Sequence, residues 1–219
     1  MTGKDENIFT VEYANSKLML LDQTALPAVE RYIECENWQR VAKAISDLEV
    51  RGAPAIGVTA AFGLVLAVKA SSATTHKEIL NELEGVAESL IATRPTAVNL
   101  AWAVQEVMEV ARSSQTVEEM QQSVESTAQQ LHAEDLAICK AIGDAGAELL
   151  AGAKNVITHC NAGGLATVGY GTALGVIRSA HRENPDLHVW VDETRPVLQG
   201  ARLTSYELHR DGIDCTEDG

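Results

Sequence analysis

The chain has 219 residues, of which 46% are apolar, so it is long enough to bury the core of one large domain or two small ones. Acidic residues outnumber basic ones by 31 to 17, and the formal net charge is −14. Because this charge repels nucleic-acid phosphates and anionic lipid head groups, we expect neither as a partner. A small anionic ligand remains compatible, since local arginines and helix N-termini set the potential inside a pocket.

The cysteines and histidines give no sign of a metal site. Cys35, Cys139, Cys160 and Cys215 form no C-x-x-C pair, and the six histidines are dispersed, so we expect neither a zinc site nor a disulfide framework. A reducing compartment fits this cysteine usage. Residues 1–6 are polar, and no apolar run approaches the ~20 residues that span a bilayer. These features predict a cytoplasmic protein.

The N-terminal part is predicted to combine a hairpin with helices. Two β-rich runs, residues 8–13 and 17–22, flank a polar turn and indicate a β-hairpin. Asn37 is a candidate N-cap for the helix that follows, and Thr75 with Glu78 forms a capping-box pattern before another apolar-periodic segment. We therefore expect a helical lobe after the hairpin.

A long helix is predicted next, because Thr116 and Glu119 repeat the capping-box pattern and the apolar periodicity runs to about Gly152. We expect this helix to link two domains. Beyond it, the pattern predicts strands at residues 155–159 and 187–191, a glycine-bearing turn at 161–164, helices at 165–180 and 201–210, and the start of a third strand at Ile213.

These elements predict an α/β fold, in which a small β-hairpin plus helical N-terminal domain precedes an incomplete Rossmann-like parallel α/β domain. We place the first domain at residues 1–115, the linking helix at 116–152 and the second domain at 153–219. Two or three strands are too few for a doubly wound sheet. The second domain is therefore expected to be cut short.

Residues 51–57 form the first candidate site. Gly52 allows close backbone approach, and Pro54 suits the first turn of the apolar helix that follows. The free N–H groups of a helix start, together with Arg51, could hold a phosphate. Arg94, in the break between two helices, could share the same anion. The alternatives are a glycine turn with a solvated Arg51, and a surface charge at Arg94.

Cys160 follows the first predicted parallel strand, at the edge where open α/β sheets bind ligands. The turn at residues 161–164 is expected to expose N–H groups, and a cysteine near a helix N-terminus can have a lowered pKa. The alternative is a buried structural thiol. His159 should point to the opposite strand face, so we do not pair it with Cys160. Gln199 could donate its amide to a phosphate or sugar oxygen, or could cap a helix.

A dinucleotide-binding site is the competing interpretation of this strand, turn, helix and strand ending at Asp192. Its glycine fingerprint is absent, because His159 and Cys160 stand where the first glycine is needed, and Gly169, Gly171 and Gly175 have the wrong spacing. We therefore do not expect nicotinamide binding.

Four segments in this order, residues 50–57, 93–100, 158–163 and 191–196, resemble the methylthioribose-1-phosphate isomerases, and residues 198–204 extend the likeness. These enzymes are grouped with the initiation factor 2B regulatory subunits and the ribose-1,5-bisphosphate isomerases. The resemblance implies conversion of 5-methylthioribose 1-phosphate to 5-methylthioribulose 1-phosphate in methionine salvage, without a metal or organic cofactor. It implies that Cys160 is catalytic, that the substrate is contacted by Arg51, Gly52, Ala53, Arg94 and Gln199, and that full-length members are homodimers.

The chain departs from the family pattern at its end. The family's catalytic aspartate and an asparagine–lysine substrate contact lie beyond Ile213, and neither is found before Gly219. Asp214 and Asp218 fall too early in the motif to take the aspartate's role. We therefore expect a fragment of a longer protein or the product of a damaged reading frame. The alternatives within the family are a ribose-1,5-bisphosphate isomerase and a non-catalytic regulatory binding protein of the initiation factor 2B type.

Overall fold

A computed structural model describes residues 9–218, so the predicted start of the first strand at residue 8 lies outside the described residues. The chain begins with an antiparallel sheet in the order β1 (Val11–Ala14), β2 (Lys17–Leu21) and β3 (Tyr32–Cys35). Asn15 and Ser16 join β1 to β2 with φ angles of 53° and 62°, as a two-residue hairpin turn requires. The hairpin is confirmed. The third strand was not predicted, because it has only four residues and depends on pairing with β2.

Five helices follow this sheet along the described chain: α1 (Trp38–Ser46), α2 (Ala53–Ala70), α3 (His76–Thr93), α4 (Val98–Ser113) and α5 (Val117–Ala147). The predicted caps are present. Asn37 Oδ1 accepts the Arg40 N–H at 2.9 Å, and Thr75 and Glu78 satisfy each other's backbone N–H groups. Thr116 caps α5 by accepting the Glu119 N–H at 3.1 Å.

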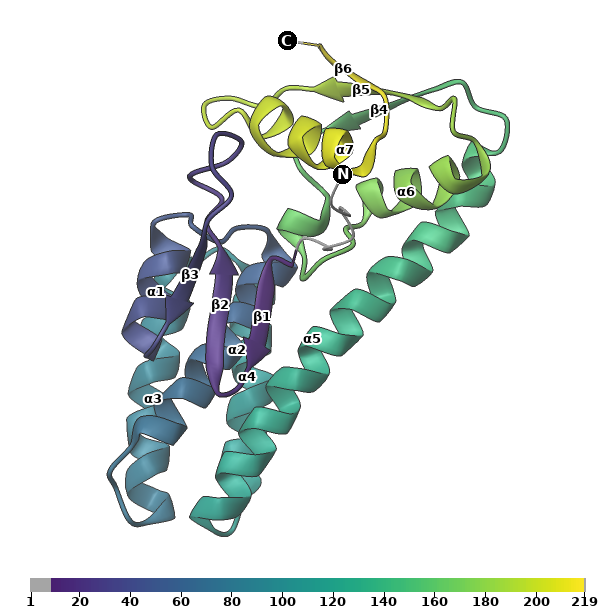
Figure 1. Cartoon of the computed structure of the whole chain (residues 1–219). Helices are drawn as coiled ribbons and strands as arrows, with labels where there is room; N and C mark the ends of the chain where they lie inside the picture. The colour runs from purple at the N-terminus through teal and green to yellow at the C-terminus, as the bar shows by residue number, and fades with distance from the viewer. Residues whose placement is uncertain (1–8, 219) are drawn as a thin grey trace.

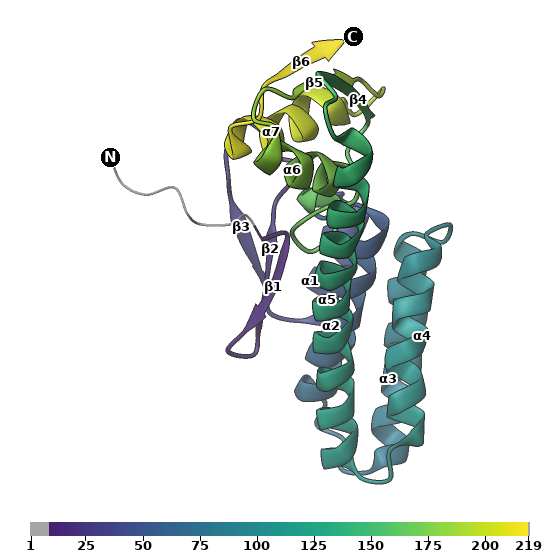
Figure 2. The same cartoon turned by 90° about the vertical axis from the view of Figure 1, so that its right-hand side faces the viewer.

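Helix α2 forms the centre of the N-terminal core. The antiparallel sheet lies on one side of it and α3 and α4 lie on the other (Figure 2). By length and composition alone α2 could cross a membrane, but 72% of its residues are buried inside the molecule, as in the core helix of a soluble protein. Its burial on every side explains why the sequence shows an almost continuous apolar run rather than a stripe.

The C-terminal part is built on a parallel sheet in the order β4 (Asn155–His159), β5 (His188–Asp192) and β6 (Cys215–Asp218). Its other elements are short 3₁₀ turns η1 (Glu148–Leu150) and η2 (Gly164–Ala166), helix α6 (Ala173–Glu183), the π-helical turn η3 (Gly200–Thr204) and helix α7 (Ser205–Asp211). Apolar residues of α6 and α7 pack against β5, with Leu174, Ile177 and Leu208 fully buried. The predicted fold class is confirmed.

The predicted helix at residues 165–180 was wrong in its first half. The chain forms η2, then a turn through Gly171 with φ +86°, and α6 begins only at Ala173. The Thr172 and Leu174 N–H groups both donate to the Ala162 carbonyl, so the start of α6 still lies against the turn that follows Cys160.

Helix α5 connects the two parts. It has 31 residues, about 46 Å at 1.5 Å per residue, and runs from the helical lobe to the parallel sheet, where α6 packs on its C-terminal half (Figure 1). The N-terminal part also contacts the C-terminal part directly, because the Thr10 hydroxyl donates to the Gly164 carbonyl at 2.6 Å and Gln23 Nε2 donates to the Leu165 carbonyl at 2.7 Å.

Candidate active site

Cys160 is the residue that follows β4, and its backbone is held in an unusual conformation. Its φ angle is +61°, a left-handed value that costs a non-glycine residue roughly 1–2 kcal/mol. The Cys160 N–H donates to the Asp192 carbonyl at 3.3 Å, and the Thr204 hydroxyl donates to the Cys160 carbonyl. The side chain is half-buried and forms no disulfide. Cys160 therefore differs from the fully buried Cys35 and Cys139, as the functional reading of this residue requires.

The loop before α2 meets the C-terminal part through Gly52. This glycine has φ +96°, and a Cβ atom at its position would lie 2.3 Å from both the Cα and the carbonyl oxygen of Ala166. Only glycine fits such a contact. Ala53 begins α2 and Pro54 lies in its first turn, as predicted. The close approach brings Arg51 to the segment that begins at Cys160.

Arg51 lies among charges contributed by both parts of the chain. The pKa of the Arg51 guanidinium is lowered, first by burial and then by the neighbouring charges of Arg202 and Arg94, while the nearby Cys160 side chain acts in the opposite direction. Arg94 belongs to the C-terminal end of α3 rather than to the start of a helix, and Arg202 belongs to η3. The structure thus places Cys160 and three arginines in one neighbourhood.

These three arginines lack carboxylate partners. Within residues 9–218, no ion pair joins a carboxylate to Arg51, Arg94 or Arg202, although the chain is strongly acidic. Carboxylates do pair with Arg31, Arg40, Arg112, Arg178, Arg182 and Arg210. Among residues 9–218, Arg195 also has no such pair, but its side chain is exposed. Positive charge that the protein leaves uncompensated is a characteristic of anion sites.

Arg202 was not predicted as a site residue. Its guanidinium donates to the Val197 carbonyl at 3.3 Å, and it reaches the carbonyls of Thr24 and Leu26 at 3.0 and 3.1 Å. It therefore bridges the two parts of the chain beside Arg51. Its place in the 198–204 motif was visible in the sequence, but its contacts 176–178 residues away were not.

Gln199 lies just before η3, on a loop that Glu193 organises. The Glu193 carboxylate accepts the N–H groups of Thr194, Gly200 and Ala201 at 2.6, 2.8 and 2.9 Å. Burial alone would raise the pKa of Glu193, but these donors lower it overall. The Thr194 hydroxyl donates to Gln199 Oε1 at 2.5 Å. Because the Gln199 amide nitrogen has no partner among the described residues, it can donate to a ligand.

Two expectations about the Cys160 turn have different outcomes. His159 is indeed separate from Cys160: its Nδ1 pairs with the Asp192 carboxylate, and its side chain is 64% exposed. The expectation of exposed N–H groups at residues 161–164 was wrong at Gly164, whose N–H donates to the buried Glu207 carboxylate at 2.7 Å. That N–H is not available to a ligand.

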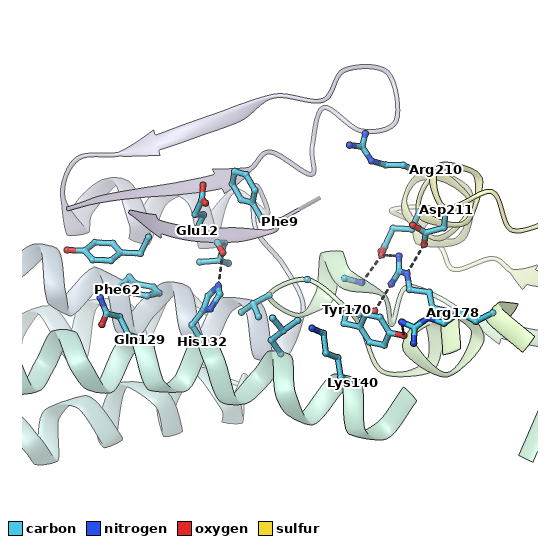
Figure 3. A pocket seen from close by; sticks show the side chains of 18 residues that line it. Phe9, Glu12, Phe62, Gln129, His132, Lys140, Tyr170, Arg178, Arg210 and Asp211 are labelled. Atoms are coloured by element: carbon cyan, nitrogen blue, oxygen red, sulfur yellow. Dashed lines mark hydrogen bonds and ion pairs between the residues drawn. The ribbon is translucent and has the colours of Figure 1, made fainter. Parts of the chain in front are cut away.

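Neither of two cavities contains the predicted site residues. The larger, about 720 Å³, lies between β1, α5 and α6 and is lined by His132, Lys140, Tyr170 and Arg178 among others (Figure 3). A smaller hollow of about 230 Å³ lies between α2, α4 and α5, beside Pro54 and Asn99. Within residues 9–218, no group of three or more His, Cys, Asp or Glu side chains is placed to hold a metal ion.

A parallel βαβ unit with a thiol at the carboxyl end of its first strand, close to three arginines without carboxylate partners, is typical of α/β proteins that bind small ligands at this edge of the sheet. The chain belongs to the initiation factor 2 subunit family, whose model matches residues 49–217. This confirms the family grouping inferred from the sequence motifs.

Curated relatives share about half of the residues. The chain is 51% identical over 199 residues to a methylthioribose-1-phosphate isomerase of Herpetosiphon aurantiacus, covering 90% of this chain and 56% of the relative. It is 49% identical over 209 residues to the corresponding protein of Geobacter metallireducens, covering 94% and 60%. The chain thus spans less than two thirds of the length of these relatives.

Solved structures show the same similarity. The 5-methylthioribose 1-phosphate isomerase of Pyrococcus horikoshii matches with a TM-score of 0.90 and 39% identity, over 97% of this chain and 60% of that one. The translation initiation factor eIF-2B subunit delta of A. fulgidus matches with a TM-score of 0.88 and 41% identity, over 96% and 62%.

Proposed function

We propose that this chain forms part of an aldose–ketose isomerase that converts 5-methylthioribose 1-phosphate to 5-methylthioribulose 1-phosphate in methionine salvage. The observation that carries the proposal is the group of three arginines without carboxylate partners beside Cys160. Arg51 and Arg94, with the start of α2 at Gly52 and Ala53, bind the substrate phosphate. Gln199 donates its amide to a sugar or phosphate oxygen. Cys160 is the catalytic residue.

The chemistry explains why a thiol and an anion site are needed together. The phosphate blocks the anomeric oxygen, so the furanose cannot open to a free aldehyde as an unsubstituted sugar does. Ring opening therefore needs an acid near the ring oxygen, and the conversion then moves a hydrogen from C2 to C1. Fixing the phosphate on arginines holds C1 and C2 at a set position relative to the half-buried Cys160 side chain.

The small hollow between α2, α4 and α5 includes none of the proposed site residues, but Pro54 in its lining directly follows Ala53. Its lining suits a thioether better than a second phosphate. Apolar side chains provide much of its lining, including Val58, Leu131 and Ile138, and its charged lining residues are the acids Glu134 and Asp135. A second phosphate would be repelled by these carboxylates, whereas a methylthio group is apolar. This observation supports methylthioribose 1-phosphate over ribose 1,5-bisphosphate.

We also propose a location, an oligomeric state, a partner and a domain division for the protein. The absence of C-x-x-C pairs supports a cytoplasmic location, and the family resemblance supports a homodimer with a small sugar phosphate as its partner rather than nucleic acid or a membrane. The distribution of helices and sheets supports a division into residues 1–115, 116–152 and 153–219.

Calorimetric titration of the 219-residue chain with 5-methylthioribose 1-phosphate tests the proposal, with ribose 1,5-bisphosphate in a parallel titration. We expect Arg51→Ala and Arg94→Ala each to weaken binding by roughly 1.5–3 kcal/mol, the cost of losing a charged hydrogen bond. Arg112→Ala is the matched control, because it removes the same charge from a pair with Glu84 on the α3–α4 surface.

Equal affinity in all four proteins would refute the phosphate assignment. Tighter binding of the bisphosphate would favour the ribose-1,5-bisphosphate isomerase. Binding of both sugars without turnover in a longer form that includes the segment present in the relatives would favour a regulatory protein, as the name of the A. fulgidus structure suggests for that chain.

A further inference from the structure

Glu207 is a buried carboxylate that the proposed reaction does not use. It lies on α7 with 2% of its surface exposed, yet four donors converge on it. Its Oε1 accepts Asn161 Nδ2 at 2.9 Å and the Leu165 N–H at 3.3 Å. Its Oε2 accepts the Gly164 N–H at 2.7 Å and Arg178 Nη2 at 2.9 Å. Three of these donors belong to the turn that follows Cys160.

The turn is shaped to fit this carboxylate. A Cβ atom at Gly163 would lie 2.3 Å from Glu207 Oε1, and one at Gly164 would lie 2.4 Å from the Gly169 carbonyl oxygen. Both positions thus need glycine. The pair of glycines after Cys160, which the sequence suggested as a ligand cradle, instead admits a side chain from α7.

Arg178 makes the burial of Glu207 possible. A buried carboxylate needs an opposite charge and donors on both oxygens. Arg178, on α6, also pairs with Asp211 at 2.6 Å and donates to the Tyr170 carbonyl at 2.5 Å, and Figure 3 shows its side chain between Tyr170 and Asp211. Burial lowers the pKa of the Arg178 guanidinium, but the negative charges of Glu207 and Asp211 raise this pKa by more, so that it lies above its ordinary value.

A short chain of contacts joins Glu207 to Cys160. Asn161 Nδ2 donates both to Glu207 and to the Thr204 hydroxyl, the latter at 3.1 Å. The Thr204 hydroxyl in turn donates to the Cys160 carbonyl. Cys160 itself has the left-handed φ of +61°, a conformation that persists only when its surroundings fix it. Thr204 in η3 and Glu207 on α7 supply that restraint.

We propose that Glu207 is a positioning residue for Cys160: it clamps the 161–165 turn and thereby sets the orientation and access of the thiol without touching the substrate. The inference rests on the proposed function for its meaning in catalysis. The clamp itself has a readout that is independent of turnover, namely the rate at which iodoacetamide alkylates Cys160, followed by peptide mass spectrometry.

The test compares Glu207→Gln with Asp211→Asn in the 219-residue chain. Both variants lie on α7, remove one negative charge and break one ion pair with Arg178, but only Glu207 contacts the turn. In Glu207→Gln an amide NH₂ faces donors, so the turn opens more often. We expect Cys160 alkylation to become about tenfold faster, because losing one charge-assisted hydrogen bond raises the population of the open turn by about that factor. Asp211→Asn should match the parent chain.

Thr204→Val keeps the test decisive if Glu207→Gln does not fold, because it removes only the hydroxyl between Asn161 and Cys160 and should also accelerate alkylation. The affinity for 5-methylthioribose 1-phosphate should be unchanged in Glu207→Gln, since the arginines that hold the phosphate are intact. Equal alkylation rates in Glu207→Gln and Asp211→Asn would overturn the inference. Failure of the parent chain itself to bind the sugar phosphate would count against the proposed function alone.

Discussion

The backbone conformation of Cys160 predicts that Cys160→Gly removes the thiol needed for activity and yet leaves the chain more stable than Cys160→Ala does. Its φ of +61° strains alanine as much as cysteine, whereas glycine adopts it freely. Replacing alanine by glycine at this position relieves roughly 1–2 kcal/mol of backbone strain in the folded state. About 0.4–1 kcal/mol of this gain is lost, because glycine makes the unfolded chain more disordered. Cys160→Gly should therefore be more stable than Cys160→Ala by about 0.5–1 kcal/mol, although both variants lack the thiol.

For a chain of this length, such a difference raises the melting temperature by about 1–4 °C, which differential scanning calorimetry resolves. The matched control is Ala73→Gly, the same change in a loop between α2 and α3 where φ is not positive. It should lower the melting temperature, because only the unfolded-state effect remains. If Cys160→Gly melts below Cys160→Ala, as Ala73→Gly melts below its parent, strain at this position is refuted.

Three further results are expected. Cys160→Ala should abolish turnover of 5-methylthioribose 1-phosphate in any active preparation while thermal stability is largely kept; near-normal turnover would exclude a catalytic thiol. Gly52→Ala should cost at least about 1–3 kcal/mol of stability in urea unfolding, because its Cβ would lie 2.3 Å from Ala166, and an unchanged midpoint would contradict this contact. Glu193 has a pKa below its ordinary value of 4.5, so its contribution is present above pH 4.5 and is lost as the pH falls through the lowered pKa. The stability difference between the parent chain and Glu193→Gln should accordingly shrink from pH 7 to pH 3, and a constant difference would show that Glu193 titrates normally.

Local signals predicted the elements whose causes are local. Asn37, Thr75 and Thr116 cap helices as their patterns indicate, and β4 has the predicted bounds of residues 155–159. The third strand β3 was missed, because four residues next to a charged segment become a strand only by pairing with β2. The helix at 165–180 was placed too early, because Gly171 and contacts from Thr10 hold residues 164–172 in turns.

The same division applies to the candidate site. Arg51, Gly52 and Cys160 stand at a helix start or a strand end, positions that a sequence pattern can recognise. Glu207 gave no such signal: its role depends on the Gly164 N–H, 43 residues away, and a glutamate in an amphipathic helix is usually solvated. The site residues that sequence reasoning misses are those that act through long-range contacts.

The turn after Cys160 also has a consequence for the order in which the chain folds. Thr10, from the first strand region, holds the Gly164 carbonyl across 154 residues, and Glu207 holds the N–H of the same residue from the other side. Contacts between distant residues form late, because loop closure must precede them. On a ribosome, the conformation of Cys160 is therefore completed only after residue 207 has emerged, so the thiol remains unrestrained while residues 161–206 are being synthesised.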